Sequence, residues 1–180
     1  MDSFLLILDI IVFAVFIVAV IHKWGVPTNL STTYYLFESE RCRTGWIFPL
    51  FLCFISSTAI PIWIRTTINM SVKNQRFVCL PYITLFCLLL VAITASYKKK
   101  RGLTIFHYSC AICASFCSVM WIFITSYKII YVGLGILFAF VVGGICSKTL
   151  KQCAIFWLEV ANFYAIFFTL LTINLFELKL

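Results

Sequence analysis

The sequence predicts an all-α integral membrane protein, a polytopic transmembrane helical bundle of about six spans. Of its 180 residues, 63% are hydrophobic and 11% are charged, whereas soluble domains are usually about 45–50% apolar and about 25% charged. A soluble fold of this size cannot hide so much apolar surface, because surface area falls too slowly with volume. The apolar runs are continuous and about twenty residues long, which is helix length, and they lack the alternation of barrel strands.

We expect one membrane domain over residues 1–180, with spans near residues 4–21, 46–64, 77–97, 104–125, 129–147 and 153–176. The first span has no basic segment before it and no small-residue cleavage site after it, so we interpret it as a retained span. A polar loop follows at residues 23–44. Pro61 is expected to kink or end the second span, and Pro81 lies in the first turn of the third, where proline is tolerated.

The last three spans are joined by short turns, at residues 126–128 and 148–152. Short turns predict that these spans pack as antiparallel neighbours. Spans four and five also carry small residues, which allow close packing in lipid. On span five these are Gly135, Ala139 and Gly143, and on span four a stripe of cysteines (Cys110, Cys113 and Cys117) lies among alanines and serines. We therefore interpret both rows as packing faces and not as redox or metal sites.

The basic residues predict the orientation. If the N-terminus lies outside, nine of the 14 lysines and arginines fall on inner segments and five on outer ones. The positive-inside rule then places both termini on the non-cytoplasmic side. Four of the inner residues form a tetrad that is also our candidate for lipid headgroup binding: Lys98, Lys99, Lys100 and Arg101. Because the basic residues lie between spans, they indicate topology and not a nucleic-acid partner.

Three ionisable residues fall inside predicted spans, where charge is expensive and often functional. They are Asp9, His107 and Glu159, and Asn162 shares a helix face with Glu159. Each also has a structural interpretation: Asp9 as a hydrated carboxylate near the interface, His107 as an interfacial anchor, and Glu159 as a hydrogen-bond partner of a neighbouring helix.

His107 and Glu159 lie toward the same membrane face as the first loop and the tetrad, so a site built from several spans is expected there. Asp9 belongs to the opposite half, roughly 20 Å along its helix from His22. A buried glutamate can act as a general base, which makes His107 and Glu159 our catalytic candidates. No two candidate metal ligands are paired on one helix, as they are in many metal sites, so we predict no metal and no cofactor.

Short stretches of the chain carry a family resemblance: the loop start Pro27–Tyr34, the Gly45–Phe48 entry to span two, and the His107–Ala111 start of span four. In layout and in these stretches the sequence resembles the six-span membrane proteins related to DRAM and to factors of GPI-anchor remodelling. The resemblance implies a six-helix bundle with a lipid-related or membrane-organising role, and no catalytic set. The sequence departs from eukaryotic members in its charge count, which places the first loop inside.

Three functional hypotheses follow. The first is a non-enzymatic protein that binds or organises membrane lipids. The second is a small proton-coupled transporter with Asp9 and Glu159 as relay points, and the third is an intramembrane enzyme using His107 and Glu159. The lack of a recognised nucleophile or metal motif favours the first. The sequence leaves open whether a second copy or another membrane protein is a partner.

Overall fold

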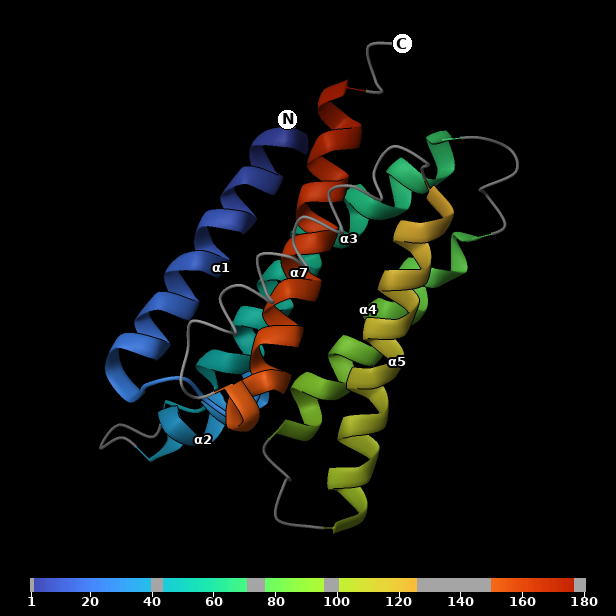
Figure 1. Cartoon of the computed structure of the whole chain (residues 1–180). Helices are drawn as coiled ribbons and strands as arrows, with labels where there is room; N and C mark the ends of the chain where they lie inside the picture. The colour runs from blue at the N-terminus through green and yellow to red at the C-terminus, as the bar shows by residue number, and fades with distance from the viewer. Residues whose placement is uncertain (1, 40–43, 71–76, 96–100, 126–149, 177–180) are drawn as a thin grey trace.

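A computed structural model describes residues 2–39, 44–70, 77–95, 101–125 and 150–176. The regular structure in these ranges is helical, and the helices form a bundle (Figure 1), which confirms the predicted fold class. In chain order the elements are α1 (Asp2–Trp24), the 3-10 turn η1 (Leu30–Thr32), α2 (Thr33–Glu38), α3 (Ile47–Met70), α4 (Cys79–Thr94), α5 (Arg101–Thr125) and α7 (Leu150–Phe176).

Four of the helices, α1, α3, α5 and α7, are long and apolar enough to cross a membrane. The 23 residues of α1 extend about 35 Å at 1.5 Å per residue, against a hydrocarbon thickness of about 30 Å. The chain is therefore an integral membrane protein. Helix α4, with 16 residues, is shorter and extends about 24 Å. The predicted fifth span with Gly135, Ala139 and Gly143 lies outside the described residues, as do Lys98, Lys99 and Lys100.

The outer faces of the helices are apolar. On α5, for example, Ile112 is 69% exposed and Phe116 is 63% exposed. Exposed apolar surface of this extent is typical of contact with another apolar phase and not with water. These faces therefore suit contact with lipid, as the composition predicted.

Helix α3 continues through Pro61 to Met70. Of the two expectations for Pro61, a kink or an end of the helix, the end is therefore wrong, as is the predicted limit of this span at residue 64. Proline is tolerated in membrane helices where neighbouring helices hold the freed segment in place. Beyond Pro61, Trp63 and Thr67 are both buried, and Thr67 accepts a hydrogen bond from Trp121 of α5 at 2.9 Å. Packing against α5 therefore keeps the end of the helix in the bundle.

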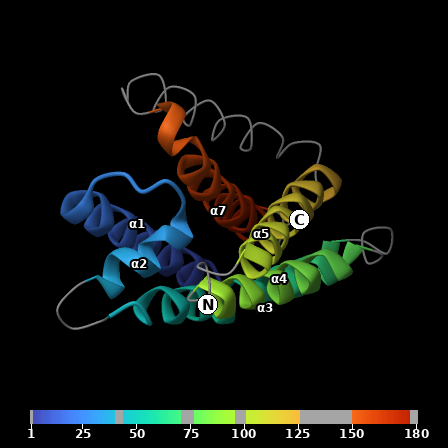
Figure 2. The same cartoon turned by 90° about the horizontal axis from the view of Figure 1, so that it is seen from below.

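The helices surround a common interior (Figure 2). Helix α4 packs most extensively on α5, and α1 packs on α3 and α7. The core divides into two clusters of buried side chains. One contains Phe13, Phe48 and Phe156, together with Leu30 from the first loop. The other, which contains Trp63 and Trp121, lies farther from that loop.

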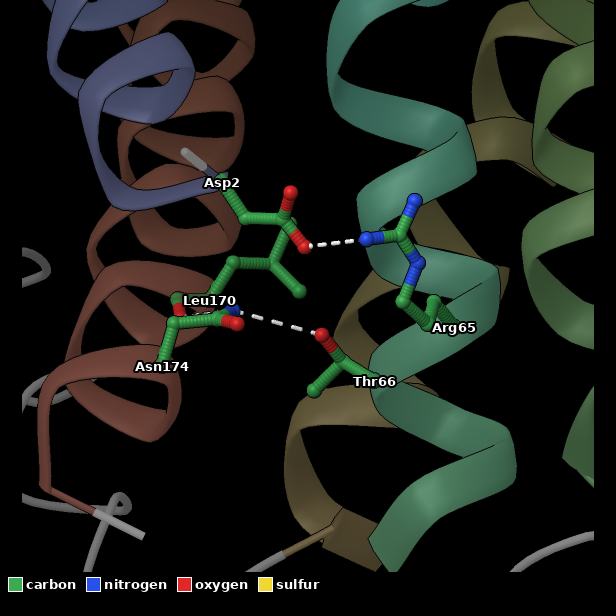
Figure 3. A network of polar contacts seen from close by, with 5 residues as sticks. All are labelled: Asp2, Arg65, Thr66, Leu170 and Asn174. Atoms are coloured by element: carbon green, nitrogen blue, oxygen red, sulfur yellow. Dashed lines mark hydrogen bonds and ion pairs between the residues drawn. The ribbon is translucent and has the colours of Figure 1, made fainter. Parts of the chain in front are cut away.

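The first turn of α1 and the last turns of α7 lie at the same end of the bundle, and the first loop with α2 lies at the other (Figure 1). At the terminal end, Asp2 of α1 forms an ion pair with Arg65 of α3 at 2.8 Å. Beside it, the Asn174 amide of α7 donates to Thr66 Oγ1 at 3.3 Å (Figure 3). These contacts connect three helices, although an ion pair with an exposed arginine stabilises little.

Candidate functional site

The first loop folds into a fixed turn directly after α1. Helix α1 ends at Trp24, and Gly25 follows it with a φ of 77°, in the left-handed region that favours glycine after a helix C-terminus. The turn that follows is organised by the side-chain oxygen of Asn29. This oxygen accepts hydrogen bonds from the Thr32 amide at 2.9 Å and from the hydroxyls of Thr32 and Ser31, both at 2.8 Å.

This turn is buried between helices, and we call residues 29–33 the plug. Leu30 and Ser31 are no more than 4% exposed. The Leu30 backbone amide donates to Glu159 Oε2 of α7 at 2.6 Å, a short distance typical of a charged acceptor. On the other side, the Asn29 side chain donates to the Tyr108 hydroxyl of α5 at 3.5 Å. The plug therefore bridges α5 and α7.

A cavity of about 80 Å³ lies among α3, α4, α5 and α7, and two plug residues, Leu30 and Ser31, form part of its wall. The rest of the wall is mostly apolar, with side chains such as Ile55, Leu88 and Ala114, and the cavity is partly open. Its volume is roughly half that of a 150 Å³ engineered cavity that binds benzene. It can therefore enclose a small molecule or one end of a larger one.

One set of polar groups on the cavity wall is paired within the protein. The Asn162 amide of α7 donates to Ser118 Oγ of α5 at 3.0 Å, and Glu159 accepts from the plug. Glu159 and Asn162 both line the cavity, as their shared helix face suggested. Because these groups have partners, they do not require a ligand.

A second set of polar groups on the wall has no partner. Trp63 Nε1 and Thr84 Oγ1 are buried, at 2% and 4% exposure of the residue, and both residues line the cavity. Neither atom has a hydrogen-bond partner in the described part of the chain. Most buried polar side-chain atoms are hydrogen-bonded, so an exception needs an explanation.

Asp9 is fully buried between α1 and α3, so its side chain is covered by protein. The Thr58 hydroxyl of α3 donates to Asp9 Oδ1 at 2.7 Å, while Oδ2 has no partner among the described residues. Asp9 is not among the residues that line the cavity.

His107 is also buried, at 2% exposure. Its Nδ1 lies 2.9 Å from Thr94 Oγ1 of α4, so it joins α4 to α5. Among the described residues, the cavity wall includes Glu159 but not His107. The cavity therefore does not bring the two catalytic candidates together.

The described residues hold no group of three or more histidines, cysteines or acidic residues that could bind a metal ion. Cys110 and Cys117 of α5 are buried, but Cys113 is exposed. Cys110 belongs to the same core cluster as Cys87 of α4 and Ala114. The buried cysteines of α5 therefore behave as small packing residues.

Sequence reasoning missed the plug, Trp63 and Thr84. An asparagine followed two and three residues later by hydroxyl side chains is a signal for a capped turn, and Asn29, Ser31 and Thr32 fit it. Nothing in the local sequence distinguishes Trp63 or Thr84 from other residues of their helices.

Comparison with known proteins assigns no family, because no family model, curated protein or solved structure matches this chain.

Proposed function

We propose that this membrane protein binds a lipid-derived amphiphile inside its helix bundle and is not an enzyme. The observation that carries the proposal is the partly open cavity among four helices, with an apolar wall and a few polar groups. Small-molecule sites in proteins have this composition. Because the cavity encloses only about 80 Å³, it would hold one end of a lipid, and the remainder would extend past its rim into the bilayer.

The contacts of the two catalytic candidates favour a binding role over an enzymatic one. A general base must reach the proton that it removes, directly or through one water molecule. Glu159 accepts a hydrogen bond from the plug, and His107, which is not among the residues that line the cavity, is joined to Thr94. The buried His107 and the partly buried Glu159 thus both have structural contacts within the bundle.

Two features along the cavity favour binding over transport. Two plug residues, Leu30 and Ser31, form part of the wall toward the first loop. Farther along α3, the Trp63 ring packs edge-on against the Trp121 ring, with centroids 5.1 Å apart. A molecule bound between the plug and the Trp63–Trp121 contact would be held in the bundle. A transport pathway that runs through the bundle would require both of these features to move.

Filling the cavity should lower lipid retention. Ala114 lines the cavity and is 4% exposed, so Ala114→Leu should occupy much of the space. We expect native mass spectrometry from a mild detergent to show at least a several-fold lower ratio of copurified lipid to protein. Ser115→Leu, also on the wall, provides a second filling variant if the first folds poorly.

Ala19→Leu is the matched control, since it makes the same change at an exposed position on α1. It should retain lipid as the unchanged protein does. Equal lipid retention in folded Ala114→Leu, Ser115→Leu and Ala19→Leu would show that lipid binds elsewhere, and the proposal would be wrong.

The proposed orientation places both termini on the non-cytoplasmic side. The charge count supports it, and the shared end of the first turn of α1 and the last turns of α7 fits termini on one side (Figure 1). A side-specific reporter fused after Leu180 should be active outside the cytoplasm, as should one fused before Met1. A cytoplasmic signal from either fusion contradicts this orientation.

A further inference from the structure

The end of the cavity away from the plug carries two unpartnered hydrogen-bonding groups. Trp63 follows Phe48, another wall residue of α3, by 15 positions in the sequence, about 22 Å along a helix. Thr84 lies at a similar level, because Leu80 and Leu85 on either side of it in α4 pack against the core cluster that contains Trp63. Trp63 and Thr84 therefore form one polar end of an otherwise apolar wall.

Other side chains of the same types show how these groups are normally satisfied. The indole of Trp121 donates to Thr67 Oγ1 at 2.9 Å. The hydroxyls of Thr67 and Thr94 donate to the carbonyls four residues earlier, at 2.8 and 2.6 Å. Thr84 makes no such bond, although its helix offers the Leu80 carbonyl at the same spacing. Its hydroxyl is thus available on the cavity wall.

We propose that Trp63 and Thr84 bind the hydroxyl head of a single-chain lipid alcohol. An indole N–H only donates, so it requires an acceptor such as oxygen. A threonine hydroxyl both donates and accepts, so it can pair with the same ligand hydroxyl. The inference rests on the proposed function for the apolar part of the ligand, and it adds the chemistry and position of the head.

The size and charge of the cavity select this head over others. A volume of about 80 Å³ accommodates a hydroxyl with a few methylene groups, but not a phospholipid headgroup together with its glycerol. A carboxylate or a cationic head would bring a net charge to an apolar wall whose two polar groups at this end, Trp63 and Thr84, are both neutral. Burying an unpaired charge costs far more than burying a hydroxyl that has hydrogen-bond partners. A neutral oxygen remains as the best match.

Binding of three probes of equal chain length tests the inference: dodecanol, dodecane and dodecanoate, each titrated against the full chain in mild detergent and followed by native mass spectrometry. The unchanged protein should prefer dodecanol over dodecane by about tenfold, and over dodecanoate as well. Each hydrogen bond lost in Trp63→Phe or Thr84→Val should lower the preference for dodecanol over dodecane by about three- to tenfold. Binding of dodecane should not change.

Trp157→Phe is the matched control. The Trp157 indole nitrogen is also buried without a partner in the described part of the chain, but Trp157 does not line the cavity, so this change should leave the preference intact. If dodecane and dodecanol bind equally, the two groups hold only water and the inference is overturned. It is also overturned if Trp63→Phe and Thr84→Val keep the full preference, or if dodecanoate binds best. If none of the three probes binds, the proposed function itself fails.

Discussion

Thr58→Val is expected to destabilise the bundle by about 2–3 kcal/mol, because it removes the one hydrogen bond that the fully buried Asp9 carboxylate makes in the described structure. An ordinary interhelical hydrogen bond in a membrane protein contributes only about 0.6 kcal/mol on average. The larger value is expected because a buried acidic group is left without a donor. The free energy of unfolding, measured by denaturant titration in micelles, checks the prediction.

Two comparisons isolate the Asp9 contact from the general effect of losing a hydroxyl. Thr172→Val removes a hydroxyl that, among the described residues, donates to the Phe168 carbonyl of its own helix, and it should cost less than about 1 kcal/mol. In an Asp9→Leu background, Thr58→Val should likewise cost little, because no carboxylate remains to be satisfied. An equal loss of stability in both backgrounds would mean that Thr58 and Asp9 are not coupled.

Glu159→Ala is expected to release the plug. The Leu30 amide donates to this carboxylate at 2.6 Å, and Leu30 is 4% exposed, so losing the acceptor would leave a buried donor unpaired. Loss of such a bond to a charged group costs about 1.5–3 kcal/mol. The plug should therefore open more often by roughly a factor of ten or more.

Thiol labelling measures this opening. Ser31→Cys places a thiol in the plug at a position that is 3% exposed. Its labelling by a maleimide, quantified by mass spectrometry of the peptide that contains it, should be about tenfold faster in the Glu159→Ala background. Glu159→Gln retains an acceptor oxygen and should have a smaller effect. Equal labelling rates in all three proteins would show that Glu159 does not hold the plug.

The sequence was sufficient for the fold class because lipid-crossing helices depend mainly on long apolar runs, which are local. It failed at the end of α3, since the continuation of this helix from Pro61 to Met70 depends on packing beyond the proline, for example between Trp121 and Thr67. Those two residues are far apart in the sequence, so a short stretch of sequence does not reveal their contact. The start of the helix was therefore predicted to within one residue, at 46 against Ile47, whereas its end was predicted at 64 and lies at Met70.

The candidate site was predicted only in part, for the same reason. The three-residue spacing of Glu159 and Asn162 places both on one helix face, and both line the cavity. The burial of the plug was not predictable, because Leu30 and Glu159 are 129 positions apart and polar loops usually lie at the surface. The unsatisfied state of Trp63 and Thr84 likewise depends on which neighbours the fold supplies.

The most direct test of lipid binding in the bundle is photo-crosslinking with a lipid that carries a diazirine on its chain, followed by mapping of adducts along α5. Exposed residues such as Ile112 and Phe116 should be labelled whether or not a lipid enters the cavity, because they face the surrounding lipid. If a lipid enters the cavity, adducts should also form on the wall residues Ala111, Ala114 and Ser115, and Ala114→Leu should remove those on Ala111 and Ser115. Adducts confined to Ile112, Phe116 and the other exposed positions would contradict the account.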